Sequence, residues 1–547
     1  MSLPTTAPFA VTLDVGTSLE NHTGTWRTER PVYLDRLPPC NNACPAGENI
    51  QAWLALAEEG KYEEAWQEIM VNNPLPGIMG RACYHPCESA CNRKDIDSAV
   101  SIHAVERFLD DEARKQGWTP RVPSQLSGKK VLVIGSGPSG LSAAYHLRRL
   151  GHSVTIFEAG PVAGGMMRFG IPAYRLPRDI VEENIQRIAD MGVEIVLNKL
   201  VEDIAAEKDA GGFDAVFLAI GAHLANRVNI PTVDAGRLLD AVGVLRDMET
   251  AHDKPMLGRR VVVYGGGNTA VDVARTAKRM GAEEAIIVYR RNRDQMPAHD
   301  FEMDEAMEEG VIVNWLTTIK EVGDGGKVMV ERMALDENGR PQPTGELDEL
   351  EADTVVMALG QNVDTSFVEK LDGVEIADKT IQVNHHFMTG HPGVFAGGDM
   401  VPSERTVTVA VGHGKHAARS IHAWLQAESY AKPEKPEVAD FSKLNPWYYT
   451  DAPETVQDML DIKRRQSTFG EVVEGLDESN ALYEARRCLS CGNCFECDNC
   501  YGVCPDNAVI KLGPGNRFKF DYDFCKGCGI CAAECPCGAI KMVPEEI

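Results

Sequence analysis

The chain has 547 residues, more than a single hydrophobic core usually holds, so several domains are expected. Its 81 acidic residues against 55 Lys and Arg give a formal net charge of −26, which disfavours binding to nucleic acid or to an anionic membrane. The sequence contains neither an apolar run of about 18–20 residues nor a signal-peptide pattern, so a cytoplasmic protein is predicted.

The 16 cysteines lie only near the two ends of the chain. Five fall between Cys40 and Cys91, and eleven fall between Cys488 and Cys537. Disulfides form in oxidising compartments and would be scattered along the chain. Two dense cysteine groups in a cytoplasmic chain therefore indicate metal binding.

The first 125 residues contain helical patches and are predicted to form a helical domain around the first cysteine group. From Gly128 onward, short β runs alternate with glycine turns and helices, and the βαβ unit that begins there is repeated from Arg259. Two such units predict an α/β fold class with two Rossmann-like nucleotide-binding domains. The helical domain is expected at 1–125. The first nucleotide-binding domain is expected at 126–230 and 355–430, and the second is inserted in it at 231–354. A linker at 431–487 then leads to a small α+β domain at 488–547.

The first βαβ unit carries a dinucleotide-binding loop. Gly135, Gly137 and Gly140 follow the strand VLVI in the motif GSGPSG, and the next strand ends in Glu158. Glycines at these positions let a pyrophosphate approach the N-terminus of the next helix, whose N–H groups favour negative charge. The terminal acid is placed to accept hydrogen bonds from a ribose diol. This order of elements predicts a bound dinucleotide rather than a packing turn.

A later segment of the same domain indicates which dinucleotide is bound. The sequence PGVFAGGDM places Gly397, Gly398 and Asp399 after a short apolar strand. An acid in this position can meet the polyol chain of a flavin, although the motif by itself could be a simple turn. Together with the preceding strand VVMALGQ, it favours FAD in the first nucleotide-binding domain.

The second βαβ unit has the glycines but not the acid. Gly265, Gly267 and Ala270 stand in the motif GGGNTA, and the following strand ends in Tyr289, Arg290 and Arg291. An acid at this position would favour NAD, whereas arginines can hold the 2′-phosphate of NADP. Arginines solvated at the surface are the alternative, so NADP is favoured and NADH stays open.

Two complete bacterial ferredoxin runs lie near the C-terminus, Cys494-x2-Cys497-x2-Cys500-x3-Cys504-Pro and Cys525-x2-Cys528-x2-Cys531-x3-Cys535-Pro. In such pairs the fourth cysteine of each run ligates the cluster of the other run. One [4Fe–4S] cluster is therefore predicted on Cys494, Cys497, Cys500 and Cys535, and a second on Cys525, Cys528, Cys531 and Cys504. A zinc site of four cysteines would not need eight ligands in this repeat.

The N-terminal cysteines form Cys40-x3-Cys44 and Cys83-x3-Cys87-x3-Cys91. These five cysteines are more ligands than one cluster needs and fewer than two clusters need. The pair Cys488-x2-Cys491 also stands outside the ferredoxin runs.

Taken together, the motifs resemble the glutamate synthase small (β) subunit family of FAD- and NAD(P)-dependent oxidoreductases. Relatives include the flavin half of dihydropyrimidine dehydrogenase and the large subunit of the NADH-dependent ferredoxin:NADP oxidoreductase. The resemblance covers residues 35–430 and rests on CNNACPAGENI, GRACYHPCESAC, GSGPSG, GGMMRFGIPAYRLP, GGGNTA, YRRNRDQMPA and GVFAGGDM. Family members hold FAD in the first nucleotide fold, NAD(P) in the second, and two [4Fe–4S] clusters in the N-terminal segment.

The resemblance implies a set of cofactor contacts. The flavin contacts are Gly135, Gly137, Ser139, Gly140, Glu158, Gly165, Arg168, Gly398 and Asp399. The nicotinamide nucleotide contacts are Gly265, Gly267, Asn268, Thr269, Arg290 and Arg291. The segment 164–177 is expected to lie along the flavin, where Arg168 could stabilise a reduced anionic ring.

The sequence departs from the family pattern at the first cluster. The family carries a CxxC phrase just before the position of Cys40; here that phrase is absent, but ARRCLSCG stands at 485–492. We therefore expect Cys488 and Cys491 to fold back and complete a cluster with Cys40 and Cys91.

The neighbouring cluster would use Cys44, Cys83 and Cys87. Its fourth ligand would be Glu106, because some relatives have Gln or Glu in the matching helix. In the alternative there is one N-terminal cluster, and the CxxC pair at 488–491 consists of spare thiols.

The cofactors imply the chemistry. Nicotinamide transfers two electrons as hydride and iron–sulfur clusters transfer one at a time, so a flavin, which does both, must lie between them. Electron transfer between NAD(P)(H) and [4Fe–4S] carriers is predicted, with no catalytic base. Relatives with a dicluster ferredoxin tail serve in larger redox complexes, so a 2-oxoacid or aldehyde oxidoreductase partner is expected. A glutamate synthase small subunit and a stand-alone NAD(P)H:ferredoxin reductase are the alternatives.

Three other classes fit poorly. A thiol–disulfide reductase needs a cysteine pair beside the flavin, and residues 92–487 contain no cysteine. A pyrimidine reductase needs a substrate barrel of about 250 residues. Two intact nucleotide folds argue against a non-enzymatic iron–sulfur scaffold.

Overall fold

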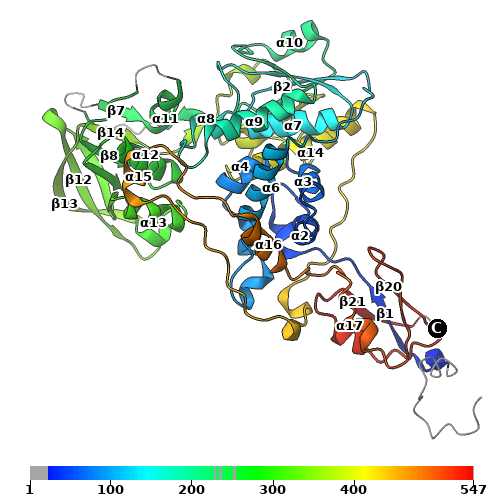
Figure 1. The fold of residues 1–547 in the computed structure, drawn as a ribbon. Helices are drawn as coiled ribbons and strands as arrows, with labels where there is room; N and C mark the ends of the chain where they lie inside the picture. Colours follow the sequence, from blue (N-terminus) through cyan, green and yellow to red (C-terminus); the bar gives the residue numbers. More distant parts are fainter. Residues whose placement is uncertain (1–21, 227–229, 233–236, 251–253, 546–547) are drawn as a thin grey trace, which may run out of the picture.

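The computed structural model describes residues 22–226, 230–232, 237–250 and 254–545 (Figure 1). The two nucleotide-binding domains lie side by side, the N-terminal helices pack beneath the first of them, and the C-terminal domain extends furthest from the second (Figure 1). This arrangement confirms the predicted architecture. Among the described residues, no helix combines the length and the apolar character that crossing a membrane requires.

The N-terminal domain is helical. Three of its helices, α1, α4 and α5, start at a proline, which is favoured there because the first N–H of a helix has no intrahelical partner. Trp53 and Trp66 are fully buried and share one hydrophobic core with Val131 and Leu141 of the first nucleotide-binding domain. The two domains are therefore packed as one body. The helices are α1 (Pro39–Ala43), α2 (Ile50–Glu58), α3 (Tyr62–Met70), α4 (Pro76–Ala82), α5 (Pro86–Ser89) and α6 (Ile102–Gln116).

The first nucleotide-binding domain is built on a parallel five-stranded sheet of order β18-β5-β2-β3-β4. The strand β2 is apolar along almost its whole length because helices cover both faces of such a sheet. The strands are β2 (Lys130–Ile134), β3 (Ser153–Phe157), β4 (Glu194–Val196), β5 (Ala215–Leu218) and β18 (Val394–Ala396). The helices are α7 (Pro138–Arg149), α8 (Met166–Phe169), α9 (Arg178–Asp190), α10 (Ile204–Gly211) and α14 (Val407–Leu425).

The second nucleotide-binding domain repeats this plan with the order β10-β9-β8-β14-β7, again parallel, and adds an antiparallel sheet. The parallel strands are β7 (Arg237–Asp240), β8 (Arg260–Tyr264), β9 (Glu284–Val288), β10 (Ile312–Asn314) and β14 (Thr354–Met357). The antiparallel strands are β11 (Thr317–Val322), β12 (Lys327–Leu335) and β13 (Pro341–Glu351), and the helices are α11 (Ala241–Thr250), α12 (Asn268–Arg279) and α13 (Asp300–Glu308).

The C-terminal domain is completed by a strand from the other end of the chain. β1 (Glu29–Tyr33) pairs antiparallel with β21 (Ile540–Pro544). This pairing was missed from the sequence, which assigned the whole of 1–125 to the helical domain. The other elements are α17 (Asn499–Gly502), β19 (Val509–Lys511), β20 (Phe518–Phe520) and α18 (Ile530–Ala533).

The segment 431–487, which the sequence suggested as a linker, is packed against the second nucleotide-binding domain and the helical domain. Its helix α15 (Ile462–Ser467) contacts α12, and its helix α16 (Glu478–Arg486) contacts α2 and α6 (Figure 1). Arg465 of α15 pairs with Glu309, at 3.2 Å from Nε to Oε1, and with Glu308, at 3.0 Å. The segment therefore ties the second nucleotide-binding domain to the helical domain.

Candidate functional site

The first glycine loop lies between β2 and α7. Gly135 has φ +102°, and a Cβ atom there would lie 2.4 Å from the carbonyl oxygen of Ala219. A Cβ on Gly140 would lie 2.0 Å from the oxygen of Gly135, whereas the space beside Gly137 is open. Two of the glycines are thus required by packing, and the third leaves room for a ligand at the N-terminus of α7.

Glu158 braces this loop. Its carboxylate accepts hydrogen bonds from the backbone N–H of Ser136 at 3.0 Å and of Gly160 at 2.8 Å, and from the Ser136 hydroxyl. A carboxylate has about four lone-pair sites, so the predicted ribose contact is compatible with this role.

Two other segments, those of Gly165 and Gly398, approach this loop. Gly398 has φ +74°, and its Cβ would lie 3.0 Å from Cβ of Ser139; a Cβ on Gly165 would lie 2.8 Å from Cα of Gly137. The Ser139 hydroxyl is buried and has no hydrogen-bond partner among the described residues. A buried hydroxyl without a partner is costly unless a ligand supplies one. The residues present therefore fit a polar ligand such as the pyrophosphate of FAD.

Two further predicted flavin contacts lie in different settings. Burial raises the pKa of Asp399 to about 6, so this acid lies in a protected position beside the loop. Arg168 is buried and donates to the Ala163 carbonyl and to Glu182, each at 3.1 Å. Its guanidinium is held within its own segment, and its contact with a flavin stays a prediction.

The second glycine loop repeats the first. A Cβ on Gly265 would lie 2.2 Å from the Ala358 oxygen, and the space beside Gly267 is open. Thr269 lies in the first turn of α12. Arg290 is exposed and Arg291 half-buried directly after β9, which runs parallel to β8. Both arginines therefore lie at the sheet edge that carries the glycine loop, where ligands of such folds bind.

Asn268, the first residue of α12, makes a contact that sequence reasoning missed. Its Nδ2 donates to Oη of Tyr84 at 2.6 Å, and its Oδ1 accepts from the backbone N–H of His299 at 3.0 Å. The rings of Tyr84 and His299 stack with centroids 3.8 Å apart. Tyr84 follows Cys83, so the N-terminal cysteine loop reaches the nucleotide-binding end of the second domain.

One cavity brings together the four cysteines that were predicted to hold the first N-terminal cluster. It is lined by Cys40, Cys91, Cys488 and Cys491, and Nδ2 of Asn92 donates to Sγ of Cys491 at 3.3 Å. Burial, reinforced by the neighbouring thiols, raises the pKa of Cys40 well above its usual value. Four thiols that converge in one cavity fit the ligand set of a cluster, whose iron would supply the positive charge that keeps them as thiolates.

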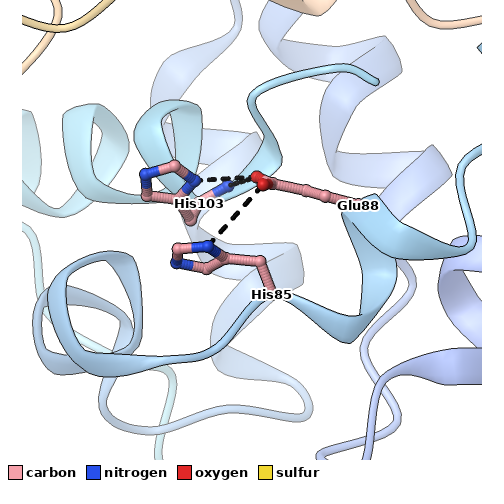
Figure 2. Close-up of side chains that lie close together, drawn as sticks. All are labelled: His85, Glu88 and His103. Carbon is pink, nitrogen blue, oxygen red and sulfur yellow. Dashed lines mark hydrogen bonds and ion pairs between the residues drawn. The ribbon is translucent and has the colours of Figure 1, made fainter. Parts of the chain in front are cut away.

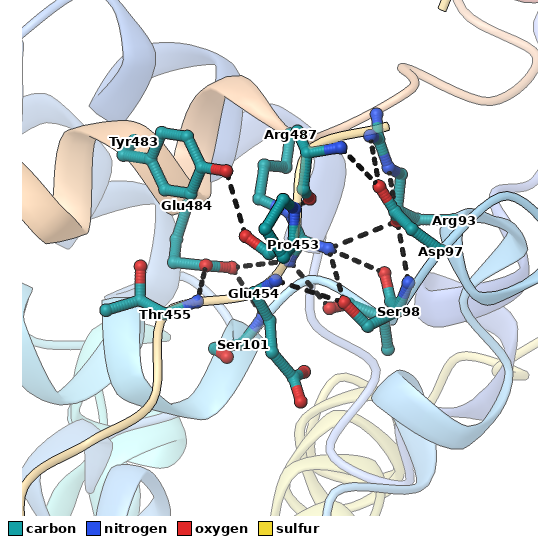
Figure 3. Close-up of polar contacts among 12 residues, drawn as sticks. Arg93, Asp97, Ser98, Ser101, Pro453, Glu454, Thr455, Tyr483, Glu484 and Arg487 are labelled. Atoms are coloured by element: carbon teal, nitrogen blue, oxygen red, sulfur yellow. Dashed lines mark hydrogen bonds and ion pairs between the residues drawn. The ribbon is translucent and has the colours of Figure 1, made fainter. Parts of the chain in front are cut away.

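Cys488 and Cys491 reach this cavity because Arg487, the residue before them, is held against the N-terminal domain. The Arg487 guanidinium is almost fully buried and donates to the backbone carbonyls of Ser98, Ala99 and Ala452, each at 2.7 Å. Glu484, one turn earlier, pairs with Arg487 at 2.8 Å and accepts from the Ser101 N–H at 3.0 Å (Figure 3). The chain therefore delivers Cys488 directly after a helix that is locked to the N-terminal domain.

The second N-terminal set is also gathered in the core. Burial raises the pKa of Cys44 and Cys83, and the buried carboxylate of Glu106 adds to the rise for both thiols. The pKa of Cys87 is raised by burial, with contributions from Cys44 and Cys83. The structure thus places all four predicted ligands in one neighbourhood.

Glu48 lies in the same neighbourhood and was missed from the sequence. Asn73 donates to Glu106 at 2.7 Å and to Glu48 at 3.0 Å, and burial raises the pKa of Glu48 to about 7. Its position four residues after Cys44 was the only available signal.

His85, Glu88 and His103 could hold a metal ion by composition, and their ligand atoms lie within 4.8 Å of one another. Glu88 instead accepts hydrogen bonds from the backbone N–H of His103 at 2.9 Å and from its Nδ1 at 2.8 Å (Figure 2). The imidazoles of His85 and His103 stack with centroids 3.7 Å apart. This network braces the loop that carries Cys83 and Cys87.

The ferredoxin cysteines fall into the two predicted sets. Cys504, Cys525, Cys528 and Cys531 line a common cavity. In the other set, burial raises the pKa of Cys500 to about 11, and the charges of its three predicted partners, Cys494, Cys497 and Cys535, add to this rise. The hydroxyl of Tyr33 lies 3.2 Å from Sγ of Cys500, which brings β1 against this set.

The unassigned Cys537 lies beside the set that contains Cys500 and Cys535. It is buried, and its Sγ lies 3.7 Å from Sγ of Cys535.

Comparison with known families agrees with this geometry. The model of the pyridine nucleotide-disulphide oxidoreductase family matches residues 101–414. The chain belongs to this family. Residues 20–118 match dihydropyrimidine dehydrogenase domain II with a 4Fe-4S cluster, and residues 518–541 match a 4Fe-4S binding domain. The protein is therefore a FAD- and NAD(P)-dependent oxidoreductase with [4Fe–4S] clusters, as the sequence predicted.

Curated relatives share most of the chain. The NADP(+)-dependent formate dehydrogenase subunit beta of Moorella thermoacetica is 38% identical over 83% of this chain and 70% of its own length. The NADPH-Fe(3+) oxidoreductase subunit beta of Geobacter sulfurreducens is 36% identical over 84% and 76%. The glutamate synthase [NADPH] small chain of Escherichia coli is 33% identical over 71% and 89%, which confirms the predicted resemblance.

Solved structures show more distant likeness. FprA of Mycobacterium tuberculosis in complex with NADPH is 21% identical, with a TM-score of 0.46 over 56% of this chain and 87% of that chain. The thioredoxin reductase of Lactococcus lactis is 24% identical, with a TM-score of 0.44 over 55% and 99%. Neither likeness bears on function.

Proposed function

We propose that this chain is the NAD(P)-reactive electron-transfer subunit of a larger redox complex, of the 2-oxoacid or aldehyde oxidoreductase type. The observation that best supports this proposal is the cavity in which the pair at 488–491 meets Cys40 and Cys91. It joins the ferredoxin domain to the helical domain, which in turn packs on the flavin-binding domain. The predicted cluster sites therefore lie in the helical domain, beneath the first nucleotide-binding domain, and in the ferredoxin domain, which extends furthest from the second (Figure 1).

The segment 445–449 supports continuity between the two cluster regions. The backbone N–H of Asn445 donates to the carbonyl of Pro536 at 3.1 Å, next to Cys535. The Tyr449 hydroxyl donates to the carbonyl of Leu489 at 3.2 Å, between the two cysteines of the CxxC pair. One short segment thus holds a ligand loop of the ferredoxin domain against a ligand loop of the N-terminal cluster site.

The share of this chain that each relative matches favours a subunit of a redox complex over a glutamate synthase small chain. The two beta subunits match 83% and 84% of this chain, whereas the glutamate synthase small chain matches 71%. The beta subunits thus account for more of a chain whose ferredoxin domain would serve a protein partner.

We further propose NADP as the nucleotide and the cytoplasm as the location. Arg290 and Arg291 lie where a 2′-phosphate would be held, and both beta-subunit relatives are named for NADP chemistry. A chain with 16 unpaired cysteines suits a reducing compartment.

Anaerobic purification from the native host, followed by mass spectrometry of what co-purifies, tests the proposal. We expect a 2-oxoacid or aldehyde oxidoreductase subunit in stoichiometric amount, and reduction of the bound flavin by NADPH faster than by NADH. A glutaminase-type large subunit would contradict the proposal and indicate nitrogen assimilation. A chain that purifies alone yet reduces ferredoxin with NADPH would be a free reductase.

A further inference from the structure

The hydroxyl of Thr408 donates to the sulfur of Cys83. The distance from Oγ1 to Sγ is 3.0 Å, and Thr408 is 5% exposed. The same hydroxyl lies 3.4 Å from the sulfur of Met79, a weak acceptor. The backbone N–H of His85 is a second donor to Cys83, at 3.4 Å. Of the two donors to this sulfur, the hydroxyl is the closer one, and it comes from a different domain.

Thr408 belongs to the first turn of α14, a helix that touches both predicted sites. On one side the Ser142 hydroxyl of α7, the helix that starts at the flavin loop, donates to the carbonyl of Val411 at 2.7 Å. On the other side a Cβ on Gly412 would lie 2.2 Å from the carbonyl oxygen of Pro45. Such close approach fixes α14 between the flavin-binding domain and the loop that follows the second N-terminal cysteine.

We propose that Thr408 is a positioning residue that raises the reduction potential of the cluster held by Cys83. The inference rests on the proposed function and deepens it, because it names a side chain of the flavin-binding domain that acts on this cluster. Hydrogen bonds to the sulfurs are among the factors that set cluster potentials. A donor binds a sulfur more strongly when the sulfur carries more negative charge.

Reduction by one electron makes the cluster and its ligands more negative, so the Thr408 hydrogen bond favours the reduced form. The electron comes from the reduced flavin, and the flavin is reduced by hydride from NAD(P)H, so no further reductant is needed. A higher potential at Cys83 favours the movement of electrons out of the flavin-binding domain.

The test is a redox titration monitored by electron paramagnetic resonance on the full chain with its cofactors. T408V keeps the shape of the side chain and removes the hydroxyl, whereas T408S keeps the hydroxyl. We expect T408V to shift the equilibrium of one cluster toward the oxidised form by about tenfold, or ~59 mV for one electron, and T408S to stay near wild type. T276V is the matched control, because Thr276 is also buried in a helix and its hydroxyl has no partner among the described residues.

Equal potentials in wild type and T408V, at equal iron content, would overturn the inference. If T408V binds less iron, T408A replaces it with the same expectation. Loss of the cluster from both hydroxyl-free variants but not from T408S would support the donor role, and its loss from T408S as well would overturn it. Reduction of wild-type clusters by NADPH is scored separately, so failure of the proposed function is distinguished from failure of this inference.

Discussion

Glu106 is a buried carboxylate next to thiols and another acid. Burial, with Glu48 and Asp110 adding to it, raises its pKa well above the usual value, and its hydrogen bond from Asn73 opposes this only in part. Iron would supply the positive charge that such a carboxylate needs. We therefore expect Glu106→Ala to lose one cluster, about four iron atoms per chain.

Glu48→Gln is the matched control, because Glu48 shares the Asn73 amide with Glu106. Iron analysis together with visible absorption spectra shows which of the two variants, Glu106→Ala or Glu48→Gln, has lost a cluster. Loss of iron from Glu48→Gln with full iron in Glu106→Ala would assign the ligand to Glu48 instead.

At the scale of elements, α16 positions the CxxC pair through Arg487. The side chains of Arg487 and Glu484 are 2% and 0% exposed, and removing one partner of a buried ion pair costs about 3–5 kcal/mol. Arg487→Ala should therefore lower the urea concentration at which cluster absorbance is lost, and should release the iron of the Cys40 site first. The control is Arg486→Ala, since Arg486 is exposed on the same helix. Equal urea midpoints for the two variants would contradict the anchoring role.

At the scale of the whole molecule, the four cysteine sets together predict about 16 iron atoms per chain, whereas a single N-terminal cluster would give about 12. We expect about 16 in protein prepared anaerobically and about 12 in Cys488→Ser, because one site loses a ligand. The control is Cys537→Ser, whose cysteine is assigned to no cluster. A count that does not change in Cys488→Ser would mean that the pair at 488–491 consists of spare thiols.

The nucleotide-binding loops could be predicted because their signal is local. Gly135 and Gly265 sit between a strand and a helix that are contiguous in the sequence, and a Cβ at either would strike a backbone oxygen. The two sets of ferredoxin cysteines could be proposed in the same way, because the spacing of the cysteines within each run indicates the cluster type. The resemblance was needed for Glu106, which carries no spacing signal.

The contacts between distant segments could not be predicted in this way. Tyr84 meets Asn268 across 184 positions, and β1 pairs with β21 across the whole chain. The fold-back of Cys488 was suggested by a displaced motif, but nothing in the sequence indicated that Arg487 would hold it. Thr408 gave no signal either, since a threonine in a helix is ordinary.

The sequence by itself determined the cofactor classes and the two Rossmann-like domains, and it predicted the grouping of the ferredoxin cysteines, because each depends on residues a few positions apart along the chain. Only the tertiary structure decided which segments face each other: the cavity shared by both ends of the chain, the packing of 431–487 and the hydroxyl beside Cys83. The physical reason is that burial and hydrogen bonding between remote segments depend on how whole domains pack, and local spacing does not record that packing.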